Sequence, residues 1–167
     1  ALGYVNKTLI NSSLLSAQNR QRYYWTNFPV SQPSDKGLLL KDVLDAEFSF
    51  HPRPCSNISG VSESRDGLIQ VGMALDISGF EQRKRVYSAN GKSPTLMGGQ
   101  GGNLEVKVSC GDEKYRKLSP TEYARLQGFP DNWCDVVVSK SRSYMCYGNA
   151  WTVDVIAHIF KCAYREN

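Results

Sequence analysis

Apolar and polar positions along this chain predict strands near its start and helices near its end. The runs 8–11 and 22–26 are rich in β-branched and aromatic residues, and they predict two strands, or one strand and an arm, around a polar connector. From about Pro29 to Cys110, short apolar pieces alternate with Gly, Pro, Ser and Asn. That pattern is typical of short strands joined by long loops, so it predicts a small irregular β domain.

A short helix is predicted over residues 120–127. Ser119 suits the N-cap, and Pro120 suits the first helical position, where no amide donor is needed. Glu122 is placed to complete a capping box, and Gly128 supplies a stop. These signals alone would suit any well-capped helix.

A final helix is predicted after a polar link through residues 139–143, with Asn149 as its N-cap. Two apolar stripes follow at helical spacing: Val153, Ile156, Ala157, Phe160 and Tyr164, and Val155, Ile159 and Cys162. Two stripes predict that the helix is covered on much of its circumference. The strands and helices together predict an α+β fold.

Length and charge set broad limits. A chain of 167 residues can bury one core or two small ones, and a net charge of +4 is compatible with a polyanionic partner or simply with solubility. Five scattered cysteines and two histidines suggest neither a metal site nor a disulfide framework. No apolar run or signal peptide suggests a membrane, so we expect an intracellular protein. Because it opens at Ala1, within what reads as the end of a helix entering a strand, we expect it to be cut from something longer.

One segment carries a family resemblance. Residues 116–131 read Arg-Lys-Leu-Ser-Pro-Thr-Glu-Tyr-Ala-Arg-Leu-Gln-Gly-Phe-Pro-Asp. This string resembles motif IX of the DNA cytosine-5 methyltransferases, which in that family holds the target-recognition domain against the catalytic domain. The resemblance implies structural roles for Arg116 and Glu122, and for Gln18 further upstream.

The segment 18–22 reads Gln-Asn-Arg-Gln-Arg, so that in a strand Gln18, Arg20 and Arg22 would form a row of donors on one face. The residues alone also fit a solvated strand edge. The segment resembles motif VIII of the same family, which implies that Arg20 and Arg22 contact a flipped target cytosine, with Arg22 on the base carbonyl O2. A planar guanidinium suits carbonyl and phosphate oxygens, so lysine should substitute poorly.

The segment Gly148-Asn149-Ala150 is similar to motif X, which lines the S-adenosylmethionine pocket in the family. The resemblance implies that these three residues contribute to binding that cofactor. Taken alone, the same residues fit a helix cap without a ligand.

Segments 82–88 and 93–102 combine cations, glutamine and glycines, which can contact phosphates and base edges. Without a ligand, the two segments would also fit a charged turn followed by a flexible hairpin loop. Both segments are similar to the two recognition loops of bacterial family members. That resemblance assigns DNA contacts to Gln82, Arg83, Arg85, Thr95, Gly98 and Gly99. By this match Thr95 holds a phosphate, Arg85 faces the bases and Gln82 enters the gap left in the base stack.

The family's chemistry needs a cysteine nucleophile, a carboxylate and a glycine-rich cofactor turn, in Pro-Cys-Gln, Glu-Asn-Val and Phe-x-Gly-x-Gly segments. None of these strings occurs in the 167 residues. Pro54-Cys55-Ser56 lacks the following Gln and falls in the expected recognition region, so Cys55 is expected to be an ordinary loop cysteine.

The resemblance therefore implies the C-terminal half of a DNA cytosine-5-methyltransferase, inactive alone. The expected parts are 1–28, the edge of the catalytic domain; 29–115, the target-recognition domain; 116–138, the motif IX helix; and 139–167, motif X with the last helix. Expected partners are double-stranded DNA and an N-terminal catalytic half in the same or a separate polypeptide. The location would be cytoplasmic in a bacterium or phage and nuclear in a eukaryote. Rival hypotheses are a non-catalytic regulatory homologue and a plain DNA-binding module.

Overall fold

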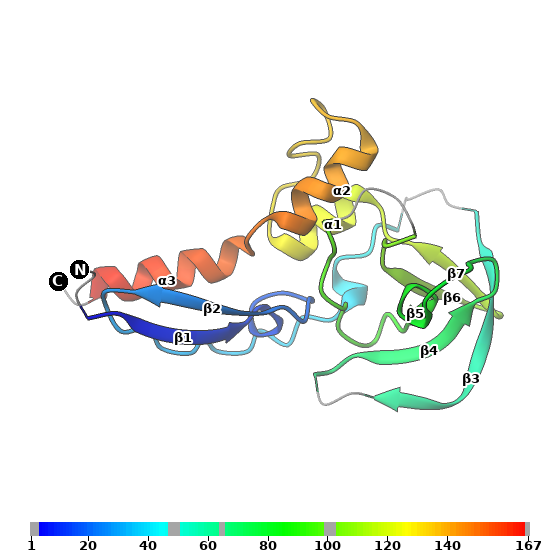
Figure 1. Cartoon of the computed structure of the whole chain (residues 1–167), viewed down its shortest axis with the longest axis horizontal. Helices are drawn as coiled ribbons and strands as arrows, with labels where there is room; N and C mark the ends of the chain where they lie inside the picture. The colour runs from blue at the N-terminus through cyan, green and yellow to red at the C-terminus, as the bar shows by residue number, and fades with distance from the viewer. Residues whose placement is uncertain (1–3, 47–50, 64–65, 99–102, 166–167) are drawn as a thin grey trace.

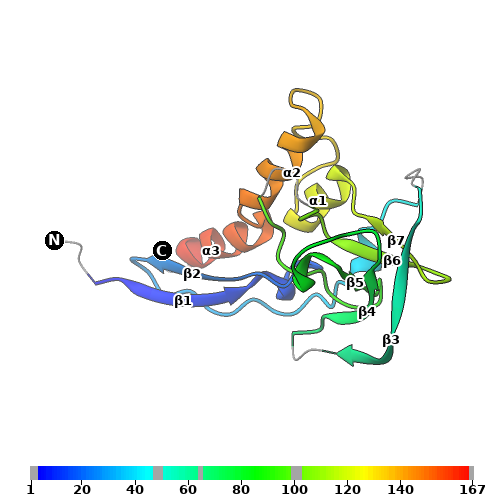
Figure 2. The same ribbon diagram turned by 45° about the vertical axis from the view of Figure 1, so that its right-hand side comes forward.

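The computed structural model describes residues 4–46, 51–63, 66–98 and 103–165. The molecule has three parts: an arm made of a β-hairpin and the last helix, a small β-barrel at the other end, and two helices between them (Figure 1). Figure 2 shows the same arrangement in a turned view. The mixed strand and helix content is the α+β composition that the sequence predicts.

The arm begins with two antiparallel strands, β1 (Asn6–Asn11) and β2 (Gln21–Thr26), in which Leu9 lies opposite Tyr23. A 3-10 turn, η1 (Ser12–Leu14), stands in the connector. Both strands lie where β-branched and aromatic residues predict them. Helix α3, which ends the described chain, lies along the hairpin (Figure 1).

Helix α3 (Val153–Arg165) buries only one of its two apolar stripes. Val155 and Ile159 are buried in one cluster with Ile10 and Leu15 of the hairpin region. Large apolar side chains that stay exposed on α3 and just before it are Trp151, Val153, Phe160 and Tyr164, and those on the hairpin and at its start are Tyr4, Val5, Leu9, Tyr23 and Trp25. The prediction that the helix is covered over much of its circumference is therefore wrong for the outer stripe.

Five strands form the barrel: β3 (Arg53–Glu63), β4 (Ile69–Ala74), β5 (Arg85–Tyr87), β6 (Lys107–Gly111) and β7 (Lys114–Lys117). Neighbouring strands are antiparallel except β5 and β6, and β7 pairs back with β3 to close the barrel. Cys55, Val86 and Tyr115 lie in its small core. Two 3-10 turns, η2 (Leu40–Asp42) and η3 (Glu81–Arg83), stand in the connections. The predicted β content of this region is confirmed.

Helix α1 (Pro120–Gln127) has the ends that its sequence predicts. The Ser119 hydroxyl accepts a hydrogen bond from the Glu122 amide at 3.1 Å, and the Glu122 carboxylate accepts one from the Ser119 amide at 2.7 Å. Gly128 then ends the helix at a φ of +79°, a left-handed conformation that glycine adopts without strain. The predicted capping box is confirmed.

Helix α2 (Lys140–Asn149) replaces the predicted polar link. Ser143 and Tyr147, four residues apart, form its buried side, so tertiary packing favours a helix over a run whose first turns are mostly polar. Asn149 is the last residue of α2, and α3 begins at Val153. The prediction that Asn149 caps the final helix is wrong.

A buried ion pair joins the barrel to α1. The Arg116 guanidinium donates to both carboxylate oxygens of Glu122, at 2.8 and 2.6 Å, and the two side chains are 6% and 0% exposed. The same carboxylate also accepts the backbone amide of Asp45 at 2.9 Å. The Glu122 side chain therefore holds three segments together: the last barrel strand, the segment around Asp45 that precedes the barrel, and the start of α1.

Within the described ranges, no helix is both long enough and apolar enough to cross a membrane. The hairpin falls inside the expected 1–28 segment, whereas β7 ends at Lys117, just past the expected boundary at 115. The division of the chain into four parts stays a prediction.

Candidate functional site

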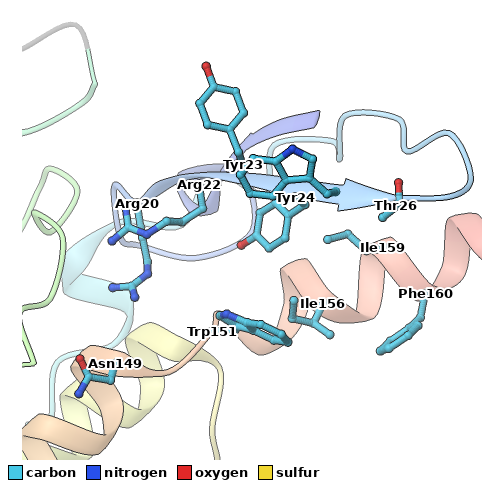
Figure 3. Close-up of a pocket in the computed structure, with 11 residues that line it drawn as sticks. Arg20, Arg22, Tyr23, Tyr24, Thr26, Asn149, Trp151, Ile156, Ile159 and Phe160 are labelled. Carbon is cyan, nitrogen blue, oxygen red and sulfur yellow. The ribbon is translucent and has the colours of Figure 1, made fainter. Parts of the chain in front are cut away.

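A cleft of about 600 Å³ opens between strand β2 and helix α3 (Figure 3). Arg20, Arg22 and Asn149, which the sequence singles out in two separate motifs, all line it. The other lining side chains are mostly aromatic or aliphatic: Tyr23, Tyr24, Trp25, Thr26, Trp151, Ile156, Ile159 and Phe160. The fold therefore brings the two motifs to one place.

Arg20 is buried at the inner end of this cleft. Its guanidinium donates to the backbone oxygen of Leu96 at 3.3 Å and to that of Ala150, 130 positions along the chain, at 3.1 Å. Loss of water around the buried group, and then the nearby charge of Arg22, lower the pKa of Arg20 below its ordinary value. Arg20 thus joins three segments of the fold through its side chain.

Arg22 is the arginine of the row that remains accessible. It lies in β2 and is exposed, and its guanidinium donates to the neighbouring backbone oxygen of Gln21 at 2.7 Å. Figure 3 shows the Arg20 and Arg22 side chains close together, on the side of the cleft nearer to Asn149. Arg22 can therefore present a fixed positive charge to a ligand in the cleft.

The expected row of three donors on one strand face is only partly formed. Gln18 and Arg20 precede β2, and Gln18 is fully buried. The Gln18 amide donates to the side chain of Gln127 at 3.2 Å and accepts the backbone amide of Leu96 at 3.0 Å. The prediction of a donor row along a strand is wrong for Gln18 and Arg20, because the protein itself uses their donors.

Two glycines let the segment 96–98 cross the end of α2 at very short range. A Cβ on Gly98 would lie 2.1 Å from the side-chain oxygen of Asn149. A Cβ on Gly148 would lie 2.5 Å from the backbone carbon of Met97. Gly148 has no room for a side chain, because the atoms it would meet belong to the backbone. A side chain at Gly98 would meet only the end of the exposed Asn149 side chain, so it would displace that amide from its place at the cleft. Glycine at position 98 therefore keeps Asn149 in place, whether or not Gly98 approaches DNA as the sequence suggests.

A second cavity, of about 420 Å³, lies on the barrel. Gln82, Arg83, Arg85 and Thr95, four of the residues expected to contact DNA, all line it. Gly98 does not belong to this lining, and Gly99 lies outside the described residues. The other residues of the lining are Phe80, Tyr87, Pro94, Met97, Asn103, Leu104, Glu105, Val106 and Lys107.

Two of these residues already have partners in the chain. The Thr95 hydroxyl donates to the backbone oxygen of Asn19 at 2.7 Å, which fixes its oxygen at the edge of the second cavity. The Arg85 guanidinium donates to the Glu81 carboxylate at 3.1 Å, a partly exposed pair. Both side chains remain at the surface of the cavity.

Comparison with known proteins identifies the family. The family model "C-5 cytosine-specific DNA methylase" matches residues 2–165. The chain belongs to this family. It is 27% identical over 160 residues to the type II methyltransferase M.Bsp6I of Bacillus sp. (strain RFL6), covering 92% of this chain and 48% of that protein. It is 28% identical over 156 residues to the type II methyltransferase M.HhaI of Haemophilus parahaemolyticus, covering 85% and 47%. The chain thus spans about half the length of these relatives.

Solved structures agree on the fold. The methyltransferase EhMeth of Entamoeba histolytica matches with a TM-score of 0.68 at 14% identity, over 98% of this chain and 54% of that one. The Dnmt2 methyltransferase of S. pombe matches with a TM-score of 0.66, also at 14% identity, over 98% and 56%. This methylase-family chain therefore shares its fold with about half of each of those methyltransferases.

A buried network of polar side chains lies behind the first cleft, and the sequence motifs do not predict it. Gln127 of α1 is fully buried, and its oxygen accepts hydrogen bonds from Gln18 and from the Thr152 hydroxyl at 2.9 Å. Its amide nitrogen donates to the backbone oxygen of Tyr147 at 2.7 Å. A polar residue on the apolar face of a predicted helix is the one local signal of such a network. In this family member, the network fixes α1 against the α2–α3 connection.

Lys107 is a second residue that the motifs do not identify. It is 2% exposed, and its ammonium donates to the backbone oxygens of Asn103 and Glu105 at 2.8 and 2.9 Å. Burial, and then the charge of Lys117, lower the pKa of Lys107 to about 8. The second cavity therefore holds a cation that loses its charge at an accessible pH.

This pKa predicts a pH effect on stability. Between about pH 8 and the ordinary lysine pKa, the unfolded chain binds more protons than the folded chain, so the free energy of unfolding rises with pH. We expect Lys107→Met to remove that rise. Across this pH window, the free energy of unfolding of wild type should therefore increase by about 1–3 kcal/mol more than that of the variant. Urea unfolding of both proteins at several pH values measures the difference. Parallel pH curves would contradict the assignment.

Cys55 lies in the barrel core, 4% exposed, and burial raises the pKa of its thiol. A thiol held protonated is a poor nucleophile, so this environment disfavours a catalytic role. Across the described ranges, no three His, Cys, Asp or Glu side chains are grouped so that they could hold a metal ion.

Proposed function

We propose that this chain is the DNA-recognition and closing part of a DNA cytosine-5-methyltransferase, which transfers a methyl group from S-adenosylmethionine to carbon 5 of a flipped cytosine. The single observation that carries the proposal is the shared cleft of Arg22 and Asn149. Family membership and the names of the two type II methyltransferases support the reaction. The length of those relatives supports a requirement for a further segment of about the same size.

In this proposal Arg22 binds the target base. Its guanidinium is permanently charged and planar, so it can donate to the cytosine O2 and to a neighbouring phosphate in one geometry. We assign the base contact to Arg22 alone, because both terminal nitrogens of Arg20 already donate to backbone oxygens. Arg20 then holds the cleft in shape.

The cofactor would bind beside the segment 148–150. The exposed Asn149 amide offers both a donor and an acceptor, and Trp151 and Ile156 provide apolar surface next to it (Figure 3). That combination suits a ligand such as S-adenosylmethionine, which has polar and apolar parts. The cofactor supplies the methyl group, and Asn149 helps to orient it.

The nucleophile would come from another segment, in the same polypeptide or a separate one. No Pro-Cys-Gln string occurs here, and Cys55 is buried away from the cleft. Trp151, just before α3, and Phe160 and Tyr164 of α3 are 68%, 60% and 80% exposed. Exposed aromatic surface of this kind supports contact with a further protein part.

Double-stranded DNA is the proposed substrate. The second cavity carries Arg83, Arg85 and Lys107. Two carboxylates offset part of this charge, because Glu81 is paired with Arg85 at 3.1 Å and Glu105 with Lys117 at 3.0 Å. The surplus of positive charge favours a polyanion, and the Gln and Arg side chains can donate to base edges.

A complementation experiment tests the proposal. The chain is mixed with a separately produced segment of M.Bsp6I that carries the Pro-Cys-Gln, Glu-Asn-Val and Phe-x-Gly-x-Gly motifs. Methyl transfer from labelled S-adenosylmethionine to DNA is then measured. We expect transfer only when both polypeptides are present. Each polypeptide alone serves as a control.

Formation of a stable complex that transfers no methyl group to a DNA pool of random sequence would count against the proposal. Tight, salt-dependent DNA binding by the isolated chain, without complementation, would favour the plain DNA-binding module instead.

A further inference from the structure

Phe80 is an exposed aromatic residue at the edge of the second cavity. It is 75% exposed, and Met97 on the same lining is 54% exposed. Phe80 occupies the N-cap of η3 but makes no side-chain hydrogen bond there. Gly79 before it has a φ of +98°, so the chain turns sharply at this point. Neither the turn nor the cap gives a structural reason for a phenylalanine.

The polar side of the cavity offers donors without enough acceptors. The Arg85 Nε–H is buried and has no hydrogen-bond partner among the residues that the structure describes. A buried donor without an acceptor is costly, so a small rotation of this guanidinium toward an acceptor in the cavity would be favourable. Gln82 adds an amide that can both donate and accept.

A cation also lies over the aromatic ring. The Arg83 guanidinium carbon is 5.6 Å from the centre of the Phe80 ring, above one of its faces. A flat ligand ring would therefore stack on the other face, so that Phe80 lies between the ligand and the cation. A volume of about 420 Å³ falls within the usual range for sites that hold small organic groups.

We propose that this cavity receives one unstacked nucleobase of bound DNA, which stacks on Phe80 between that ring and Met97 and turns its polar edge toward Arg85 and Gln82. The inference rests on the proposed function for DNA as the partner and adds a stacking residue to it. A base edge that carries a carbonyl oxygen, such as the O4 of a thymine or uracil ring, would satisfy the unpaired Arg85 donor. An anion alone would not use the aromatic side of the cavity.

The expected effect of removing the ring follows from base stacking. Loss of one base–aromatic contact weakens binding by about 5- to 100-fold. Phe80→Leu keeps an apolar side chain of similar size at an exposed position, so the fold should be unaffected. Phe80→Tyr keeps the ring and should bind like wild type.

Photocrosslinking tests the inference directly. The full chain is incubated at low salt with short duplexes that carry one mismatched 5-iododeoxyuridine, irradiated, digested and analysed by mass spectrometry. We expect an adduct on Phe80 that is retained in Phe80→Tyr and lost in Phe80→Leu, together with the fall in affinity. Trp133→Leu, at an aromatic residue that is 63% exposed and outside the cavity, should change neither result.

The outcomes separate this inference from the proposed function. Salt-dependent binding with adducts only at other residues, or an unchanged affinity of Phe80→Leu, would overturn the stacking role and leave the proposed function standing. No binding of any duplex, even at low salt, would overturn the stacking role, whereas the proposed function is decided by the complementation experiment.

Discussion

Arg22→Ala is expected to lower kcat/KM for DNA methylation by about 100- to 1,000-fold in the complemented enzyme, the usual effect of removing one well-placed donor at a reacting group. Arg22 lines the cleft from β2, and its exposed guanidinium has room for a ligand. Arg22→Lys should recover only part of the activity, because an ammonium offers a point charge instead of a planar pair of donors. Labelled-cofactor assays on both variants measure the effect.

Lys7→Ala is the matched control. Lys7 is an exposed cation of the same hairpin, lies outside the cleft, and has its ammonium 4.0 Å from the centre of the Tyr23 ring. Its removal should leave activity unchanged. Because Arg22 is exposed, its replacement should not alter the free energy of unfolding. Full activity of Arg22→Ala would remove Arg22 from the mechanism.

Glu122→Gln is expected to lower the free energy of unfolding by about 3–5 kcal/mol, since it leaves the Arg116 charge buried without its carboxylate. Glu122 is fully buried and also accepts the backbone amides of Ser119 and Asp45. Removing its charge therefore weakens both the N-cap of α1 and the contact with the Asp45 backbone. Urea unfolding followed by circular dichroism measures the change.

The chain contains a matched control for this pair as well. Arg125 donates to both oxygens of Asp131, at 2.8 and 2.6 Å, with the same sequence spacing, but the two side chains are 31% and 46% exposed. Asp131→Asn should cost no more than about 1 kcal/mol, because water screens the pair. Equal losses in Glu122→Gln and Asp131→Asn would contradict the role given to burial.

Helices and strands that depend on residues close together in sequence could be predicted from the sequence. Ser119 and Glu122 lie three positions apart, so the capping box and helix α1 could be predicted from the sequence. The two hairpin strands were equally visible, because their aromatic and β-branched residues are contiguous. Helix α2 was not, because its first turns are polar and its buried side, with Ser143 and Tyr147, exists only once α1 packs against it.

The candidate site shows the same limit. The motifs identified Arg20, Arg22 and Asn149, and the structure brings all three to one cleft. The spacing of residues in the motif could not show that Arg20 donates to the backbone oxygens of Leu96 and Ala150, because these oxygens come from distant segments. Lys107 could not be predicted for another reason: the backbone oxygens that it contacts are close in sequence, but its burial arises only when the barrel closes around it.

The Gly98–Gly148 crossing limits how such enzymes can be recombined. A side chain at Gly148 would meet the Met97 backbone, and one at Gly98 would displace the Asn149 side chain. A barrel transplanted from a relative will therefore leave the crossing and the cleft unchanged only if the donor brings glycine at the position of Gly98. Chimera junctions placed on the barrel side of Leu96 keep the native crossing intact. Engineers who wish to exchange sequence specificity between relatives therefore have a defined place to cut.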